Sequence, residues 1–160
     1  MLSNKHIIIA LLVTPVLAIL AWFSVGALVG EKAHQAEAGR SYPLVERSNC
    51  RYDSGQCDLR NEDLRLSIRF DAAIDGPQLL LQASHSLDGA LLAVAGADDK
   101  VPPQPMLMKD SRGQHWVLSL SRMPLPTERL RLVVQSGGSQ WFADASTAFL
   151  ERYREQAASD

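Results

Sequence analysis

The chain lacks the sequence signatures of common enzyme classes. It contains no G-x-S-x-G nucleophile motif, no H-E-x-x-H zinc motif and no glycine-rich phosphate loop. Its 16 lysines and arginines are balanced by 18 aspartates and glutamates, so no basic excess indicates nucleic-acid binding. We therefore expect a non-enzymatic protein that needs no cofactor and binds no nucleic acid.

Charge is also absent from one long segment. Residues 7–29 form an uncharged, mostly apolar run. A helix rises about 1.5 Å per residue and a bilayer core is about 30 Å thick, so roughly 20 apolar residues suffice to cross it. Thr14 and Ser24 can donate back to helix carbonyls, and a membrane helix tolerates Pro15. The run predicts a single transmembrane helix.

A cleaved signal peptide is the alternative to this anchor. Signal peptides have shorter apolar cores that end in a small-x-small cleavage site. The best such site, residues 24–27, falls inside the apolar run, which favours an uncleaved anchor. Lysine and arginine are too evenly spread on the two flanks to fix the orientation.

Beyond the anchor, apolar and polar residues alternate with the period of a β-strand. In residues 64–70, Leu64, Leu66, Ile68 and Phe70 occupy one face and polar residues the other. Segments 116–120 and 130–134 alternate in the same way, whereas 78–84 and 90–95 are apolar runs of strand length. Residues 140–143 make another short strand.

Turn residues separate these segments. Gly137-Gly138 lies between two strand patterns and predicts a β-hairpin. The three prolines in 101–105 indicate a stiff extended loop and exclude a central strand. Seven or eight short strands with regular turns predict a mainly β domain, an antiparallel immunoglobulin-like β-sandwich. Phe149, Leu150 and Tyr153 then predict a short C-terminal amphipathic helix, capped by Asp144 or Ser146.

These patterns predict five parts of the chain. Residues 1–6 form a cytoplasmic tail and residues 7–29 the transmembrane helix. A partly helical linker covers residues 30–42, the β-sandwich covers 43–146, and the C-terminal helix and tail cover 147–160.

Cys50 and Cys57 are the only cysteines, and the turn-forming sequence Asp53-Ser54-Gly55 lies between them. We expect a structural disulfide across a tight hairpin. Such a bridge indicates an oxidising compartment, so it places the domain outside the cytoplasm. A redox-active pair and a Cu(I) thiolate site remain as alternatives.

Met106, Met108 and His115 are candidate metal ligands. Residues 106 and 108 share one face if the segment is a strand, and thioether and imidazole groups suit Cu(I). The simpler interpretation is that the methionines fill the core and His115 lies on the surface.

Five residues are candidates for a partner surface. Pro103 belongs to the stiff loop, which loses little entropy on binding. Val117 and Val133 occupy the outward phase of their strands. Trp141 and Phe142 are adjacent on one strand, so one of them faces away from the core. A covering C-terminal helix is the alternative explanation for apolar residues on this face.

The order of anchor and strands resembles that of the bacterial FixH- and YtkA-like membrane proteins. The resemblance depends on residues 113–118 and 130–134 and on Trp141-Phe142, and it covers about a third of the chain in pattern. It implies a single membrane helix followed by a periplasmic sandwich, and a role in delivering copper to terminal oxidases. The cysteine pair departs from this pattern, and no evident copper motif accompanies it.

The sequence as a whole predicts a single-pass protein of the bacterial inner membrane with an extracytoplasmic domain. We expect this domain to bind another envelope or membrane protein, as an accessory or assembly subunit of a membrane complex. The alternative is a copper-handling accessory factor for cytochrome oxidase assembly.

Overall fold

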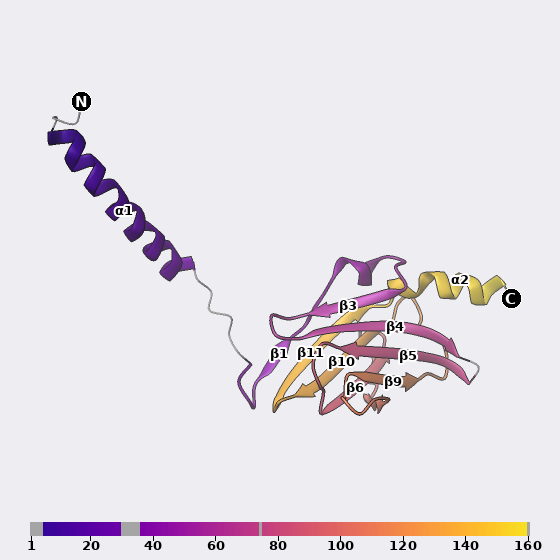
Figure 1. The fold of residues 1–160 in the computed structure, drawn as a ribbon. Helices are drawn as coiled ribbons and strands as arrows, with labels where there is room; N and C mark the ends of the chain where they lie inside the picture. The colour runs from indigo at the N-terminus through magenta and orange to yellow at the C-terminus, as the bar shows by residue number, and fades with distance from the viewer. Residues whose placement is uncertain (1–4, 30–35, 74, 160) are drawn as a thin grey trace. The chain divides into compact units, whose positions relative to one another are not determined.

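The computed structural model describes residues 5–29, 36–73 and 75–159, which fall into two units. The first unit contains helix α1, Lys5–Val29, which has Pro15 in its interior (Figure 1). Thr14 Oγ1 donates to the carbonyl of Ala10 at 2.6 Å and Ser24 Oγ to that of Leu20 at 2.7 Å. The helix predicted for this region is therefore present.

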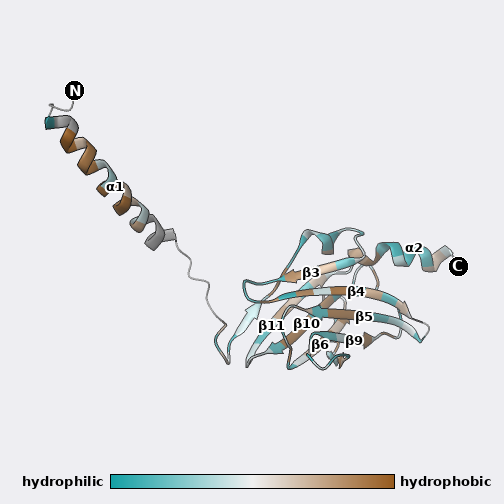
Figure 2. Ribbon diagram, in the orientation of Figure 1, coloured by the Kyte–Doolittle hydropathy of each residue, from teal (hydrophilic) through white to brown (hydrophobic). Residues whose placement is uncertain are grey.

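Side chains of α1 are described for Lys5 and for residues 8–24, and they are exposed. They are predominantly apolar (Figure 2). Within the described part of the chain, no helix is long and apolar enough to cross a membrane.

The second unit is mainly β, as predicted, and contains two sheets. The first, sheet A, has the strand order β1-β11-β10-β6-β7. Strand β1 runs parallel to β11, and the other neighbours are antiparallel. The strands are β1 (Ser41–Pro43), β6 (Gly89–Ala95), β7 (Gln104–Pro105), β10 (Arg129–Ser136) and β11 (Ser139–Ser146).

The second sheet, sheet B, is antiparallel throughout and has the order β2-β3-β4-β5-β9-β8. Its strands are β2 (Val45–Glu46), β3 (Gln56–Arg60), β4 (Arg65–Ala73), β5 (Gly76–Ala83), β8 (Leu107–Met108) and β9 (His115–Ser119). Figure 1 shows β3, β4, β5 and β9 layered against β11, β10 and β6.

One core lies between the sheets. The inward residues of both sheets belong to a single cluster of buried side chains. Leu66, Ile68 and Leu81 come from sheet B and Leu132 and Val134 from sheet A, and each is at most 2% exposed. The alternation in the sequence therefore corresponds to two sheets that bury one face each.

Proline-rich sequence leads into β7 and β8, which are edge strands of different sheets. The chain leaves sheet A after Pro105 and joins sheet B at Leu107, so this segment provides a two-residue edge strand to each sheet. Proline donates no backbone hydrogen bond, which is compatible with an edge but not with a central strand. The predicted extended loop therefore ends in edge strands.

The predicted hairpin forms around Gly137-Gly138. Strands β10 and β11 pair from Arg129↔Ser146 to Ser136↔Ser139. Both glycines have positive φ, +57° and +80°. This geometry matches a type I′ turn, whose twist fits the flanking strands.

The structure differs from the prediction at both ends of the sandwich. Residues 30–35 of the predicted helical linker lie outside the described residues, residues 36–40 are not helical and contain a turn at 38–39, and residues 41–42 belong to β1. At the other end, β11 includes both predicted caps, Asp144 and Ser146. The 3₁₀ turn η2 (Ala148–Leu150) follows, with Ser146 Oγ accepting the N–H of Ala148 at 3.1 Å.

Helix α2, Glu151–Ser159, is the short C-terminal helix that the sequence predicts. Phe149 and Leu150 precede it in η2, and both are fully buried. The ring of Tyr153 lies 4.9 Å from that of Phe70 in β4. The apolar side chains predicted for this helix therefore pack against the core at one end of the sandwich. These contacts do not cover the outer face of either sheet.

The β10–β11 turn provides a matched pair of substitutions. Gly137→Ala adds a methyl group with no heavy atom within 4 Å, whereas Gly138→Ala places one 3.3 Å from Ala38 Cβ. Positive φ alone costs about 1–2 kcal/mol for alanine. We expect Gly138→Ala to lower the free energy of unfolding more than Gly137→Ala, measured by urea denaturation. Equal losses would contradict the close approach of residue 38 to this turn.

Candidate functional site

An apolar row crosses the outer face of sheet A. Phe142 pairs with Pro43 on one side and with Val133 on the other. Val133 also pairs with Leu91, which in turn pairs with Pro105. These five residues, here called the sheet A row, occupy one register position on each of the five strands.

The row is accessible. Phe142 is 47% exposed and Leu91 40% exposed, the two prolines are exposed, and Val133 is half-buried. Scattered exposed apolar residues are ordinary, whereas a contiguous apolar strip is a candidate for a contact surface. Cross-strand neighbours lie about 5 Å apart, so these side chains form a continuous strip.

Charged groups beside the row are held by contacts within the domain. Arg131 donates to the carbonyls of Asp99 at 2.9 Å, Gly96 at 3.1 Å and Ala97 at 2.8 Å. Arg129 forms an ion pair with Asp144 and donates to its carbonyl at 2.9 Å. These arginines are thereby directed to fixed partners within the domain.

Trp141 and Phe142 occupy opposite faces of β11. Trp141 is 5% exposed and belongs to the core, and its ring lies 5.9 Å from that of Tyr42. Because neighbouring strand residues point to opposite faces, Phe142 must then point outward. The prediction that one of the pair faces outward agrees with this geometry. The prediction that Trp141 is part of the surface is wrong.

The prediction that Val117 lies on the surface is also wrong. It pairs with Leu80 on β5 and with Leu107 on β8. Val117 is only 3% exposed and is not part of the core cluster, whereas Leu107 is 66% exposed. The side chain of Val117 points outward but is buried among the side chains of neighbouring strands. Periodicity along one strand cannot distinguish this burial from exposure to solvent.

Pro103 lies where the sequence places it, in the exposed segment before β7. It precedes Gln104, which pairs with Leu92 at the edge of sheet A. The adjoining Pro105 ends the sheet A row. The proline segment therefore lies at one end of the candidate surface.

The cysteines form the predicted disulfide, and both are fully buried. Cys50 lies in the 3₁₀ turn η1 (Ser48–Arg51) and Cys57 in β3, so the bridge joins a turn to a strand. The prediction that the bridge joins two strands of a hairpin is therefore wrong. Ser54 Oγ lies 2.6 Å from the carbonyls of both Asn49 and Gln56, which closes the loop between the cysteines.

This loop holds the C-terminal segment. Gly55 N–H donates to the carbonyl of Phe149 at 3.0 Å. Arg152 donates its backbone N–H to Asp53 Oδ1 and its guanidinium to the carbonyl of Asp53, both at 2.9 Å. The backbone N–H of Arg152 holds the pKa of Asp53 below its usual value. The disulfide loop therefore serves as a docking point for the start of α2.

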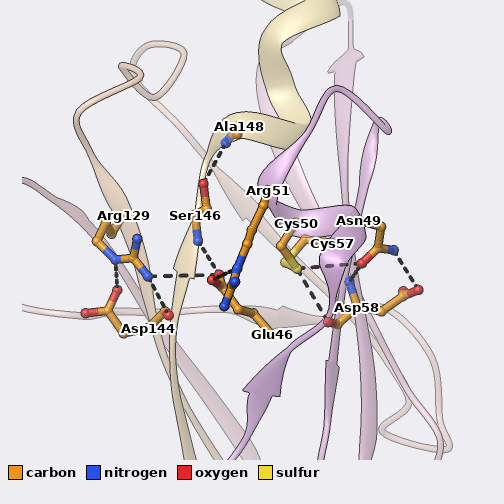
Figure 3. A network of polar contacts seen from close by, with 10 residues as sticks. All are labelled: Glu46, Asn49, Cys50, Arg51, Cys57, Asp58, Arg129, Asp144, Ser146 and Ala148. Carbon is orange, nitrogen blue, oxygen red and sulfur yellow. Dashed lines mark hydrogen bonds and ion pairs between the residues drawn. A yellow bond between two sulfur atoms is a disulfide. The ribbon is translucent and has the colours of Figure 1, made fainter.

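Glu46 connects the disulfide region to sheet A (Figure 3). Its carboxylate accepts from Arg51 Nε and from the backbone N–H of Ser146, both at 2.8 Å. Beside the disulfide, Asn49 Nδ2 donates to Asp58 Oδ2 at 2.8 Å. These groups satisfy one another, as a structural network does, and they support the structural interpretation of the cysteines.

The candidate copper ligands do not meet on one face. Met106 is 4% exposed and belongs to the core, whereas Met108 is 55% exposed. The prediction that their sulfur atoms share a strand face is wrong, because residue 106 lies between β7 and β8. His115 lies in β9, and its Nδ1 is 3.1 Å from Asp110 Oδ2. The backbone N–H of His115 is the main cause that lowers the pKa of Asp110 to about 2.

No protein-family model, curated protein or solved structure matches the chain. The resemblance to FixH- and YtkA-like proteins therefore stays a prediction from the sequence pattern.

Sequence reasoning missed three members of the sheet A row: Pro43, Leu91 and Pro105. Leu91 lies in the apolar run of residues 90–95, which has no alternation to show which side chains point outward. The prolines belong to strands of three and two residues that are too short to show a period. Only the register between strands identifies these residues.

The disulfide loop generates a stability prediction. Replacing both cysteines, Cys50→Ala with Cys57→Ala, should lower the free energy of unfolding by about 2–3 kcal/mol, because the unfolded chain regains the entropy of a small closed loop. Urea denaturation of the full chain measures this loss. Tyr52→Ala, at an exposed position of the same loop, is the control and should stay within about 0.5 kcal/mol of the parent. Equal stability of the parent and the double variant would contradict a structural role.

Proposed function

We propose that the chain is a non-enzymatic single-pass membrane protein whose extracytoplasmic domain binds another membrane-associated protein through the sheet A row. The partner contact makes it an accessory or assembly subunit of a membrane complex. The single observation that carries this proposal is the apolar strip that runs through all five strands of sheet A while the nearby arginines are held within the domain.

The proposed anchor is residues 7–29, and its support is the sequence of that segment as a whole. It contains no charged residue, and 23 residues of helix extend about 34 Å, more than the roughly 30 Å of a hydrocarbon core. The described side chains of α1 cover only residues 8–24 of this segment.

The extracytoplasmic location is supported by the disulfide. Disulfides persist in oxidising compartments and are rare where cellular thiols are kept reduced. Burial of Cys50 and Cys57 in the core cluster makes the bridge part of the folded domain. A domain that uses this bridge to hold its C-terminal segment is suited to the periplasm or the cell exterior.

The domain is proposed to be immunoglobulin-like. Strands β4, β5, β9 and β8 lie in the order of strands A, B, E and D, and β6, β10 and β11 in the order of C, F and G. Strand β7 extends sheet A beside β6, the strand that corresponds to C. Domains of this architecture commonly present sheet faces or end loops to partners, so the strand order supports a binding function by analogy only.

Hydrophobic complementarity is the proposed basis of recognition. A partner that covers the strip removes Phe142 and Leu91 from water, and interface centres are enriched in such aromatic and apolar residues. Pro43 and Pro105 lose little conformational entropy when they are covered. The partner surface is therefore expected to be apolar at its centre and polar at its rim.

Photo-crosslinking in native membranes tests the proposal. Benzoylphenylalanine at position 142 or 91 should give one specific protein adduct, whereas the same probe at position 107 should not. Leu107 is a matched control because it is 66% exposed but belongs to sheet B. With the probe at position 91, Phe142→Ser should reduce the adduct strongly, since truncation of a central aromatic residue typically costs about 2 kcal/mol or more.

The same membranes test the anchor. After washing with alkaline carbonate, the chain should remain in the pellet together with its adduct. An extracted chain would contradict the anchor, and equal adducts at positions 107 and 142, or none at 142 and 91 in folded protein, would contradict the binding surface.

A further inference from the structure

Three arginines of the domain have no polar partner for their side chains among the described residues. Every other arginine donates to an oxygen of the domain or lies within ion-pair distance of a carboxylate. Arg47, Arg60 and Arg65 make no such contact within the part of the chain that the structure describes, and all three are exposed. They line the same pocket, so the unpaired positive charges of the domain are gathered in one place.

Strand register brings two of these arginines together. Leu59 and Leu66 belong to the core cluster, so the adjacent Arg60 and Arg65 point to the outer face of sheet B. Arg60 pairs directly with Arg65 between β3 and β4. Side chains at such positions lie about 5 Å apart, and like charges there destabilise the sheet. An anion bound between the two guanidinium groups would remove this repulsion.

Arg47 reaches the same pocket from the end of β2. Its backbone N–H donates to the carbonyl of Asp58 at 2.9 Å, which extends the β2–β3 register by one pair. Directly opposite residues of an antiparallel pair share a face. Arg47 therefore lies on the outer face of sheet B with Asp58, one strand away from Arg65.

Asp58 is the only acidic residue among those described as lining the pocket. Its Oδ2 accepts from Asn49 Nδ2 at 2.8 Å (Figure 3), and its Oδ1 accepts from Gln56 Nε2 at 2.7 Å. Both carboxylate oxygens are thus held by side-chain amides rather than by the arginines. Three guanidinium groups and one carboxylate give the lining a formal charge of +2.

The pocket has the size of a small-molecule site. Its volume is about 430 Å³, and such sites occupy roughly 300–1,000 Å³. Gln82, at an outward position of β5, also lines it and is exposed. Its amide adds a neutral hydrogen-bond donor to the charged groups. The lining can therefore surround an anionic group with donors from several strands.

We propose that this pocket binds a phosphate monoester. At pH 7 such a group carries close to two negative charges, which matches the formal charge of the lining. Guanidinium groups bind phosphate oxygens with paired N–H donors, and a phosphate has enough oxygens for more than one arginine. A single carboxylate has two oxygens and one charge, so it would leave the pocket with excess positive charge. The phosphate can belong to a soluble molecule or to a lipid headgroup.

This site is separate from the sheet A row. The arginines lie on the outer face of sheet B, whereas the row crosses the outer face of sheet A. The crosslinking result at positions 142 and 91 therefore does not decide the phosphate proposal.

The test follows the backbone amide resonances of the ¹⁵N-labelled full chain in nonionic detergent, at neutral pH and constant ionic strength. Glycerol phosphate is the soluble monoester, and dihexanoyl phosphatidic acid is the lipid monoester. Diethyl phosphate is a singly charged diester, and succinate is a doubly charged dicarboxylate. The diester tests the need for two charges, and succinate tests the need for phosphate.

We expect glycerol phosphate to shift the resonances of Arg60 and Arg65 with saturation, and diethyl phosphate and succinate to bind at least tenfold more weakly. Arg60→Gln or Arg65→Gln should weaken the binding of glycerol phosphate roughly tenfold, because charge-assisted hydrogen bonds are lost. Without a probe, neither variant should be less stable to urea than the parent, because each removes a like-charge pair.

Arg112→Gln is the matched control. It removes the same charge from an arginine that lies near Asp110 and outside the pocket, so the affinity for glycerol phosphate should stay unchanged. The lipid probe identifies the source of the phosphate. Tighter binding of dihexanoyl phosphatidic acid than of glycerol phosphate would assign the site to a lipid, and equal binding would assign it to a soluble ester.

Three results would overturn the proposal. Absence of a saturable shift with either monoester would remove the site. Succinate or diethyl phosphate that binds as tightly as glycerol phosphate would show a general attraction for anions, such as the acidic side chains of a protein. Equal weakening by Arg112→Gln and Arg65→Gln would show that net charge, and not this pocket, causes the binding.

Discussion

The strict alternation of side chains along a strand is the constraint that links the interior of this domain to its surface. Each strand can bury only every second residue, so placing Trp141 in the core commits Phe142 to the outside of sheet A. The pairing of β11 with β10, and of β10 with β6, then aligns Phe142, Val133 and Leu91. A change in register by one residue would exchange the two faces, so core packing fixes which residues lie on the outer face. The apolar strip is thus inseparable from the fold, although nothing inside the domain requires its residues to be apolar.

Polar contacts fix the parts of the domain that the sheets do not hold. The buried disulfide closes a loop that receives η2 and the start of α2 through Gly55 and Asp53. In the connection just before β10, Arg122 forms a two-bond ion pair with Glu128, and this pair lowers the pKa of the glutamate. Thr147 Oγ1 lies 2.9 Å from the carbonyl of Glu128, within hydrogen-bond reach. The C-terminal segment therefore packs at one end of the sandwich, supported by the disulfide loop on one side and the β9–β10 connection on the other.

Much of the sheet architecture could be predicted from the sequence, because the longer strands show clear alternation or strong turn signals. Leu66, Ile68 and Phe70 alternate with polar residues, and Gly137-Gly138 marks the hairpin that the structure contains. The short strands could not be found in this way. Strand β1 reaches β11 across about a hundred residues of chain, and strands β7 and β8 have two residues each, so their pairing depends on long-range contacts.

The candidate surface was only partly predictable for the same reason. Phase along a single strand identified Val133 and required one of Trp141 and Phe142 to face outward, without deciding which. Phase also does not report what neighbouring strands cover, as Val117 shows at 3% exposure. The methionines illustrate a second limit. Their spacing placed Met106 and Met108 on one face only if the segment were a regular strand, and the crossing between sheets at residue 106 removes that condition. Membership of the sheet A row requires the register of five strands at once.

We propose that a partner protein covers the outer face of sheet A in native membranes, and that this face is exposed in the purified chain. Carbene footprinting of side chains, compared between native membranes and the purified full chain, tests it most directly. The account predicts that Phe142 and Leu91 are labelled in the purified chain and protected in the membrane, whereas Leu107 and Met108 on sheet B are labelled equally in both. Equal labelling of Phe142 and Leu91 in the two preparations would contradict the account.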